Sequence, residues 1–252
     1  MNLHPLPSSY VAARAELQRL ATHVLARRRF DVCGKFGLRA TPGGIGTPAF
    51  GPDHETIRVS STRLLRETSG ATATTTSLDL VGASLGDAAA LVGVDLDRPF
   101  SAGHDTPAVG DVRSPLEVDA ESAWVLFGWF GFGWGVLDAA LGALGADAAP
   151  SVVQLWPEHF DAGCDVLVGR GRRANLGVSP GDSSSAQPYL YVGPWGDERP
   201  GDPKYWNTPF GAVMTYGELG ASGSADPVST AVAFLLRGVG LLAELGDAPE
   251  GA

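Results

Sequence analysis

The chain has 252 residues, of which 44% are hydrophobic and 18% are charged. This composition supports a sizeable core and excludes a wholly disordered protein. Its 18 basic and 28 acidic residues give a net charge of −10, which argues against nucleic acid and anionic membranes as main partners, because both repel an acidic protein. The 34 glycines and 18 prolines make up about a fifth of the chain, so we expect many loops and tight turns.

The cysteines and the start of the chain predict a cytoplasmic protein. Cys33 and Cys164 are far apart, have no metal-type spacing and are too few for a disulfide framework. Residues 1–29 lack the apolar core that follows the basic start of a signal peptide.

The expected order of elements is helix, strands, helix in the first half and again helix, strands, helix in the second. Caps and apolar periodicity predict helices, and runs rich in Thr, Ile and Val predict strands. We expect a helix from Ser8 or Ser9 to about Arg28, strands at 36–40, 56–60 and 72–80, and a short helix at 84–92 that begins with a Ser84–Asp87 capping box. A long connection follows, and Asp119 begins a central helix. The second half contains expected strands at 152–156, 164–168, 174–178, 189–192 and 212–216, and a last helix that begins at Asp226–Pro227 and ends at Gly246 and Pro249.

The central helix contains an uncharged segment, residues 123–137, that could be mistaken for a membrane span. The segment is shorter than the ~18–20 residues that a bilayer needs, and Asp138 ends it. At 100° per residue, one stripe of the helix carries small residues and a tryptophan, while rings occupy the other directions. We expect this stripe to let another backbone come close, and hence a buried central helix. The stripe consists of Trp124, Gly128, Gly131, Gly135 and Gly142.

A short internal repeat suggests that the chain is built from two similar halves. Phe30-Asp31 and Phe160-Asp161 are each followed by a cysteine and then by a Leu-x-[Ala/Val]-[Ser/Thr]-Pro-Gly run. Pro followed by Gly favours a type II turn, because Pro presets φ and Gly accepts φ > 0. We predict one α+β domain, 1–252, with largely antiparallel sheet packed against helices. Its helix–strands–helix halves would be 8–95 and 119–246, joined by the long loop 97–118.

Polar residues that could carry chemistry concentrate in residues 156–161. If this segment is extended, His159 and Asp161 share a face and Glu158 takes the other. An imidazole and a carboxylate on one face suit a divalent metal ion or acid–base work. His104 with Asp105, or Asp182, could complete the site. Alternatively, the carboxylates bond loop amides and His159 is a structural histidine.

Aromatic residues form a second candidate region. Tyr189 and Tyr191, with Trp195, alternate onto one face of an expected strand, and Trp206 and Asn207 follow in a long loop. Aromatic walls with a few polar groups suit a ligand pocket, although the same residues could simply cover the core. The Gly43–Gly46 run has neither P-loop nor dinucleotide-binding spacing.

Several runs of the sequence resemble a family of uncharacterised bacterial proteins. They cover most of residues 30–216, and the resemblance implies no reaction and no ligand. The densely Phe-, Trp- and Gly-rich central helix departs from the Ala and Leu expected there. The matching runs are LWPEHFD (155–161), SPGD (179–182), PYLYVGPW (188–195), WNTPFGA (206–212), GHDTPAVGD (103–111) and FGLRATPGGIGTP (36–48).

These patterns together predict a protein that binds a small ligand or a divalent metal ion in a cleft between its two halves. Two alternatives remain: a hydrolase-like enzyme with His159 as base beside Asp161 or a bound metal, and a protein-interaction module without chemistry. The residues expected to line the cleft are His104, Asp105, Glu158, His159, Asp161 and Asp182.

Overall fold

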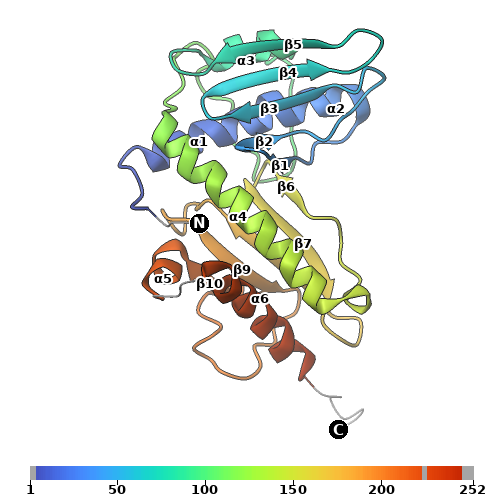
Figure 1. Cartoon of the computed structure of the whole chain (residues 1–252), viewed down its shortest axis with the longest axis vertical. Coiled ribbons are helices and arrows are strands. Elements are labelled where there is room, and N and C mark those ends of the chain that lie inside the picture. Colours follow the sequence, from blue (N-terminus) through green and yellow to red (C-terminus); the bar gives the residue numbers. More distant parts are fainter. Residues whose placement is uncertain (1–3, 223–225, 246–252) are drawn as a thin grey trace. The chain divides into compact units, whose positions relative to one another are not determined.

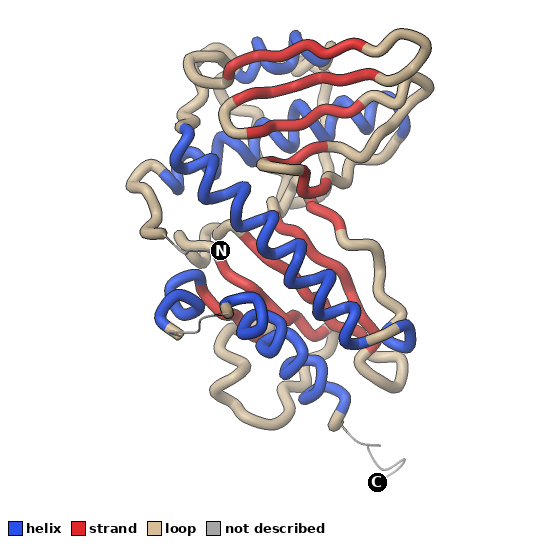
Figure 2. The backbone as a smooth tube through the Cα atoms, in the orientation of Figure 1, coloured by secondary structure: helices blue, strands red, loops and turns tan. Residues whose placement is uncertain are grey.

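The computed structural model describes residues 4–222 and 226–245 and has an α+β fold with two five-stranded antiparallel sheets. Contacts divide the chain into two compact units. The N-terminal unit comprises residues 4–131 and 154–161, and the C-terminal unit contains 132–153 and the chain from 162 onward. Figures 1 and 2 show that each unit combines a sheet of antiparallel strands with helices.

The N-terminal unit begins with one long helix and continues into a sheet with the strand order β1-β2-β3-β4-β5. The helix has a π-helical segment in its middle, where the backbone widens. Its elements are α1 (Tyr10–Leu20), η1 (Ala21–Ala26), α2 (Arg27–Cys33), β1 (Arg39–Thr41), β2 (Gly44–Gly46), β3 (Thr56–Ser60), β4 (Arg63–Thr68), β5 (Thr74–Asp79) and α3 (Leu85–Val92), with β6 (Gln154–Trp156) from later in the chain.

Apolar side chains at one register position hold this sheet to its core. Ile45 of β2 lies opposite Val59 of β3, which lies opposite Leu64 of β4, and all three are buried. Cross-strand rows of branched residues of this kind are what stabilise a sheet face. The expected capping box is confirmed at the start of α3, where the Ser84 hydroxyl accepts from the Asp87 amide and the Asp87 carboxylate accepts from the Ser84 amide.

The C-terminal unit contains most of the second sheet, whose strand order is β10-β9-β8-β7-β6. As expected, the last helix begins at Asp226, whose carboxylate accepts from the amides of Val228 and Ser229, with Pro227 at its first position. Its expected end at Gly246 and Pro249 lies outside the described residues. The elements are η2 (Ala146–Ala148), β7 (Asp161–Leu167), β8 (Arg173–Ser179), β9 (Tyr189–Pro194), β10 (Ala212–Thr215), α5 (Tyr216–Ala221) and α6 (Pro227–Ala243).

The helix α4 (Ala120–Leu144) runs through both units, and the prediction about its glycine stripe is wrong. Gly128, Gly131, Gly135 and Gly142 are exposed, and a Cβ added at any of them would meet no atom within 4 Å. The close approach occurs instead at the buried Gly133, where a Cβ would lie 2.4 Å from Cγ2 of Val178 in β8. The rings of Phe127, Trp129 and Phe130 are turned inward, and the glycine face, with Trp124, is turned outward.

Helix α4 is long enough to cross a membrane, contrary to the expectation from residues 123–137. The helix has 25 residues, and it passes a test of length and composition for a membrane-crossing helix, with a mean hydropathy of 1.4 over 18 residues. Half of that window is buried inside the structure, as in the core helix of a globular protein, which passes the same test. The helix alone is therefore weak support for either reading.

The two copies of the internal repeat agree in their turns and differ at their start. Thr41 and Ser179 each end a strand before Pro-Gly, and Gly43 and Gly181 have φ of 67° and 99°, as the type II turn requires. Phe30-Asp31, however, lies in a helix, whereas Phe160 precedes a strand. Duplication of the two halves stays a prediction. The sequence patterns missed β2, β4 and α5.

Candidate functional site

Two loops carry the candidate residues of the N-terminal unit, and the first long helix fastens both of them. One is the turn 157–160, between β6 and β7; the other is the loop 93–119, between α3 and α4. On the helix, Gln18 and Thr22 are four residues apart and therefore share a face. The side-chain amide of Gln18 donates to the Glu158 carbonyl at 2.8 Å, and the buried Thr22 hydroxyl donates to the Pro157 carbonyl at 2.9 Å.

A second row of helix side chains holds the long loop. Arg19 donates to the carbonyls of Val109 and Asp111. His23 lies one turn further on, and its Nε2 is 2.7 Å from the carbonyl oxygen of Pro107. A carbonyl only accepts, so Nε2 carries the proton. Burial lowers the pKa of His23; the hydrogen bond to the Pro107 carbonyl opposes this effect, and the charges of Arg19 and Arg27 add to it.

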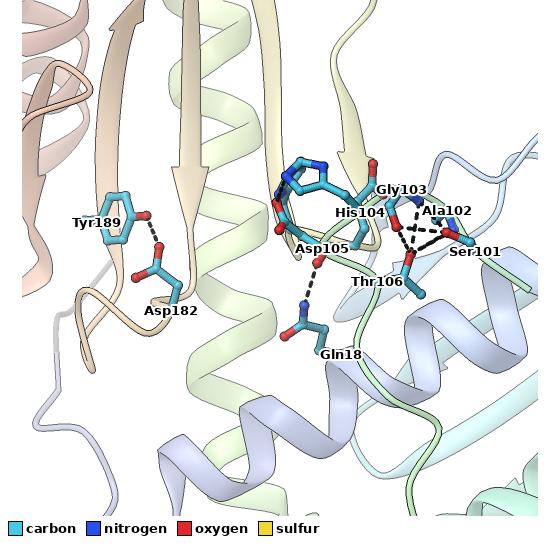
Figure 3. A network of polar contacts seen from close by, with 11 residues as sticks. Gln18, Ser101, Ala102, Gly103, His104, Asp105, Thr106, Asp182 and Tyr189 are labelled. Carbon is cyan, nitrogen blue, oxygen red and sulfur yellow. Dashed lines mark hydrogen bonds and ion pairs between the residues drawn. The ribbon is translucent and has the colours of Figure 1, made fainter.

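The tip of the long loop is a tight turn organised by one hydroxyl group. Oγ1 of Thr106 accepts from the amides of Ala102 and Gly103, both at 3.0 Å, and the Thr106 amide donates back to the Gly103 carbonyl (Figure 3). This turn presents His104 and Asp105 at its end. The sequence reading did not single out Thr106, although Thr directly after His-Asp is the residue type that closes such turns.

The turn 157–160 is not extended, so the expectation that His159 and Asp161 share one strand face is wrong. The Phe160 amide donates to the Trp156 carbonyl at 2.7 Å, and Phe160 itself has φ of 55°. The buried Phe160 ring packs edge-on against Phe130, with centroids 5.4 Å apart. Packing of this ring offsets the cost of the left-handed backbone, which a bulky residue rarely adopts. The turn points His159 toward the long loop instead.

The imidazole rings of His104 and His159 both lie close to one carboxylate oxygen of Asp105. Oδ2 of Asp105 lies 3.0 Å from Nε2 of His104 and 3.3 Å from Nδ1 of His159. The two rings are edge-on, with centroids 6.2 Å apart. The side chain of His159 is half exposed, at 48%, and His104 is largely exposed, at 87%. The imidazole groups can therefore meet a ligand from solvent.

Glu158 forms the buried side of this group. It is 7% exposed, and a Cβ on Gly103 would lie 3.5 Å from its Cγ, so the loop tip lies against it. Burial raises the pKa of the Glu158 carboxyl, and the charges of Asp161 and Asp105 add to this effect, while its own backbone amide and His159 oppose it. Oε2 of Glu158 has no hydrogen-bond partner among the described residues. We call Glu158, His159, His104 and Asp105 the imidazole–carboxylate cluster.

The arrangement of these side chains does not support the expected divalent metal site. Within residues 4–222 and 226–245, no group of three or more His, Cys, Asp or Glu side chains is placed so that it could hold a metal ion. This includes the expected set of His159, Asp161 and His104.

The remaining candidates belong to the C-terminal unit, where most of them have structural partners. Asp182 accepts a 2.5 Å hydrogen bond from the Tyr189 hydroxyl (Figure 3). Its other oxygen accepts from the amides of Ser184 and Ser185. The Tyr191 ring lies where a side chain on Gly177 would be, on the neighbouring strand β8. These contacts fit a cover over the sheet.

Three further residues of the aromatic region hold loops. The indole of Trp195 donates to the Asn175 side chain, and that of Trp206 donates to the Pro200 carbonyl. Asn207 pairs through its side chain with both backbone groups of Val213. Their indole and amide groups are thus engaged within the fold.

No protein-family model, curated protein or solved structure matches this chain. The resemblance to a family of uncharacterised bacterial proteins therefore stays a prediction, and function has to be argued from the site alone.

Proposed function

We propose that the imidazole–carboxylate cluster binds a small polar ligand and exchanges protons with it. One observation carries the proposal: a single oxygen of Asp105 lies within 3.3 Å of nitrogens of His104 and His159, which come from separate segments of the chain. Convergent titratable groups of this kind, presented by loops on a rigid helix, are typical of ligand sites.

The environments of the groups suit opposite roles in proton transfer. An adjacent carboxylate holds an imidazole in one orientation and compensates the charge that forms when the ring accepts a proton. Asp105 can do this for His159, which makes His159 the base. Glu158 keeps its proton to higher pH than an ordinary carboxyl because it is buried, so it can serve as the acid.

The second candidate is a hydrolase, and the pairing of His159 with Asp105 favours it over a purely binding protein. In this reading His159 removes a proton from a water molecule that attacks an ester carbonyl, and Asp105 positions the ring. Glu158 would give its proton to the departing alkoxide. The cluster needs no protein nucleophile for this route.

Hydrolysis of p-nitrophenyl acetate tests both candidates at pH 7. The wild-type chain should show saturable hydrolysis, and His159→Gln should lower kcat by about 100-fold or more, the range of general acid–base catalysis. Asp105→Asn should lower kcat less, because it positions the base. His54→Asn is the matched control: His54 is exposed, lies outside the cluster and has φ of 48°, which Asn tolerates.

Two results would overturn the proposal. Equal hydrolysis by wild type and His159→Gln would remove the catalytic role. A linear, unsaturable dependence on the ester in both proteins would also remove ligand binding at the cluster, and would favour the interaction-module alternative.

A further inference from the structure

A pocket of about 210 Å³ lies beside the first helix, and it includes none of the imidazole–carboxylate cluster. The base of the long loop closes it against the helix. Drug-sized ligands occupy ~300–1,000 Å³, so this pocket suits a smaller molecule. It is lined by His23, Arg27, Leu96, Asp97, Arg98, Pro99, Phe100 and Val109.

Arg27 is the buried charge of this pocket, and it is only 3% exposed. Its Nε donates to both oxygens of Asp31, at 2.8 and 2.9 Å, and its Nη1 donates to the Arg98 carbonyl at 2.9 Å. Among the described residues Nη2 makes no hydrogen bond, and it is not fully buried. Because Arg27 lines the pocket, this nitrogen is the donor that Arg27 has left for a ligand.

The walls combine this donor with an apolar surface. Phe100 lies under the Arg27 guanidinium at 5.3 Å and packs against Phe30 with centroids 5.4 Å apart. Leu96, Pro99 and Val109 extend the apolar surface. The guanidinium groups of Arg27 and Arg98 are balanced by the carboxylates of Asp97 in the lining and of Asp31, which pairs with Arg27. The pocket therefore offers a charged donor without an excess of negative charge, in a chain whose net charge is −10.

We propose that this pocket binds a small carboxylic acid anion with an apolar body. The carboxylate would accept from Nη2 of Arg27, and the apolar body would pack on Phe100. A hydrogen bond between charged partners is stronger than a neutral one, which makes a guanidinium with a free edge a carboxylate receptor. This site and the proposed function rest on different residues, so each can fail without the other.

Isothermal titration calorimetry of the full chain with benzoate tests the proposal. Benzoate should bind, benzamide should bind about tenfold more weakly because it lacks the charge, and acetate should bind more weakly because it lacks the ring. Arg27→Gln should lower benzoate affinity by about tenfold or more. Val109→Trp should abolish binding by filling the pocket while leaving both guanidinium groups in place.

Arg39→Gln is the matched control, since Arg39 is an exposed guanidinium of the same unit that does not line the pocket. It should leave benzoate affinity within about twofold, because the contacts of Arg27 and Phe100 remain. The proposal is overturned if benzoate does not bind, if benzamide binds as well, or if Arg39→Gln loses as much affinity as Arg27→Gln. If Arg27→Gln does not fold, Val109→Trp and the comparison of acid with amide decide.

Discussion

Two glycines of helix α4, two residues apart in the same compact unit, should respond oppositely to alanine. Gly135 is exposed with open space around its Cβ position, so Gly135→Ala should stabilise the protein by about 1 kcal/mol, the difference in helix propensity. At Gly133, the new Cβ would lie 2.4 Å from Cγ2 and 2.7 Å from Cγ1 of Val178. Overpacking of this kind costs about 1–3 kcal/mol, which offsets or exceeds the same propensity gain. The two variants should therefore differ by about 1–3 kcal/mol.

Urea unfolding followed by circular dichroism and tryptophan fluorescence measures this difference, and thermal unfolding gives a second reading. A gain of 1 kcal/mol corresponds to about 2–4 °C in Tm for a chain of this size. Val178→Ala makes room for the new methyl group, so adding it to Gly133→Ala should cost less than the sum of the two single changes. If Gly135→Ala destabilises the protein, or if the two glycine variants are equally stable, the assignment of inner and outer helix faces is wrong.

Three more perturbations have a defined direction. The pKa of Glu158 is raised in the folded chain, so its contribution to stability is complete below the ordinary carboxyl range of about pH 4 and is lost as the pH rises through the folded pKa. Glu158→Gln should therefore gain stability relative to wild type as the pH rises from 4 to 7. A constant difference in unfolding free energy between the two proteins over this range would contradict the burial of Glu158. Thr22→Val leaves the Pro157 carbonyl without its buried donor and should cost about 1–3 kcal/mol in urea unfolding, while Thr22→Ser should retain most of the stability; equal stability of the valine and serine variants would refute the anchoring role. Ellman's reagent should modify only the exposed Cys33 in the native chain, because burial raises the pKa of Cys164 to about 12, and two thiols should react in urea; fast reaction of both thiols without urea would count against this.

The sequence predicted which segments carry the candidate site, but not how the turn at 157–160 orients them. Dense polar residues at 103–105 and 158–161 marked both loops, and the structure brings His104, Asp105 and His159 together. The chain through His159 is a turn and not extended. Phe160 adopts a left-handed backbone because its ring is buried, and local sequence contains no sign of that tertiary contact.

The anchoring residues were missed for a similar reason. Gln18 and Thr22 look like ordinary residues on the polar side of a helix, and only the folded chain shows that they bond loop carbonyls. On α4, helical spacing correctly groups the glycines on one face but does not say which way the face points. Burial of large apolar side chains is favourable and glycine has no side chain to bury, so the rings of Trp129 and Phe130 take the inner side.

The π-helical segment Ala21–Ala26 sets how the side chains before and after it are aligned along the first helix. Its hydrogen bonds span five residues instead of four, so the segment holds one residue more than regular α-helix would. Removal of one residue inside the segment would let it close into α-helix with Arg27 still facing the Arg98 carbonyl, whereas removal of a residue from 10–20 would turn residues 10–20 on one side of the cut by about 100° relative to those on the other. We therefore expect natural deletions in this helix to fall within 21–26 more often than within 10–20.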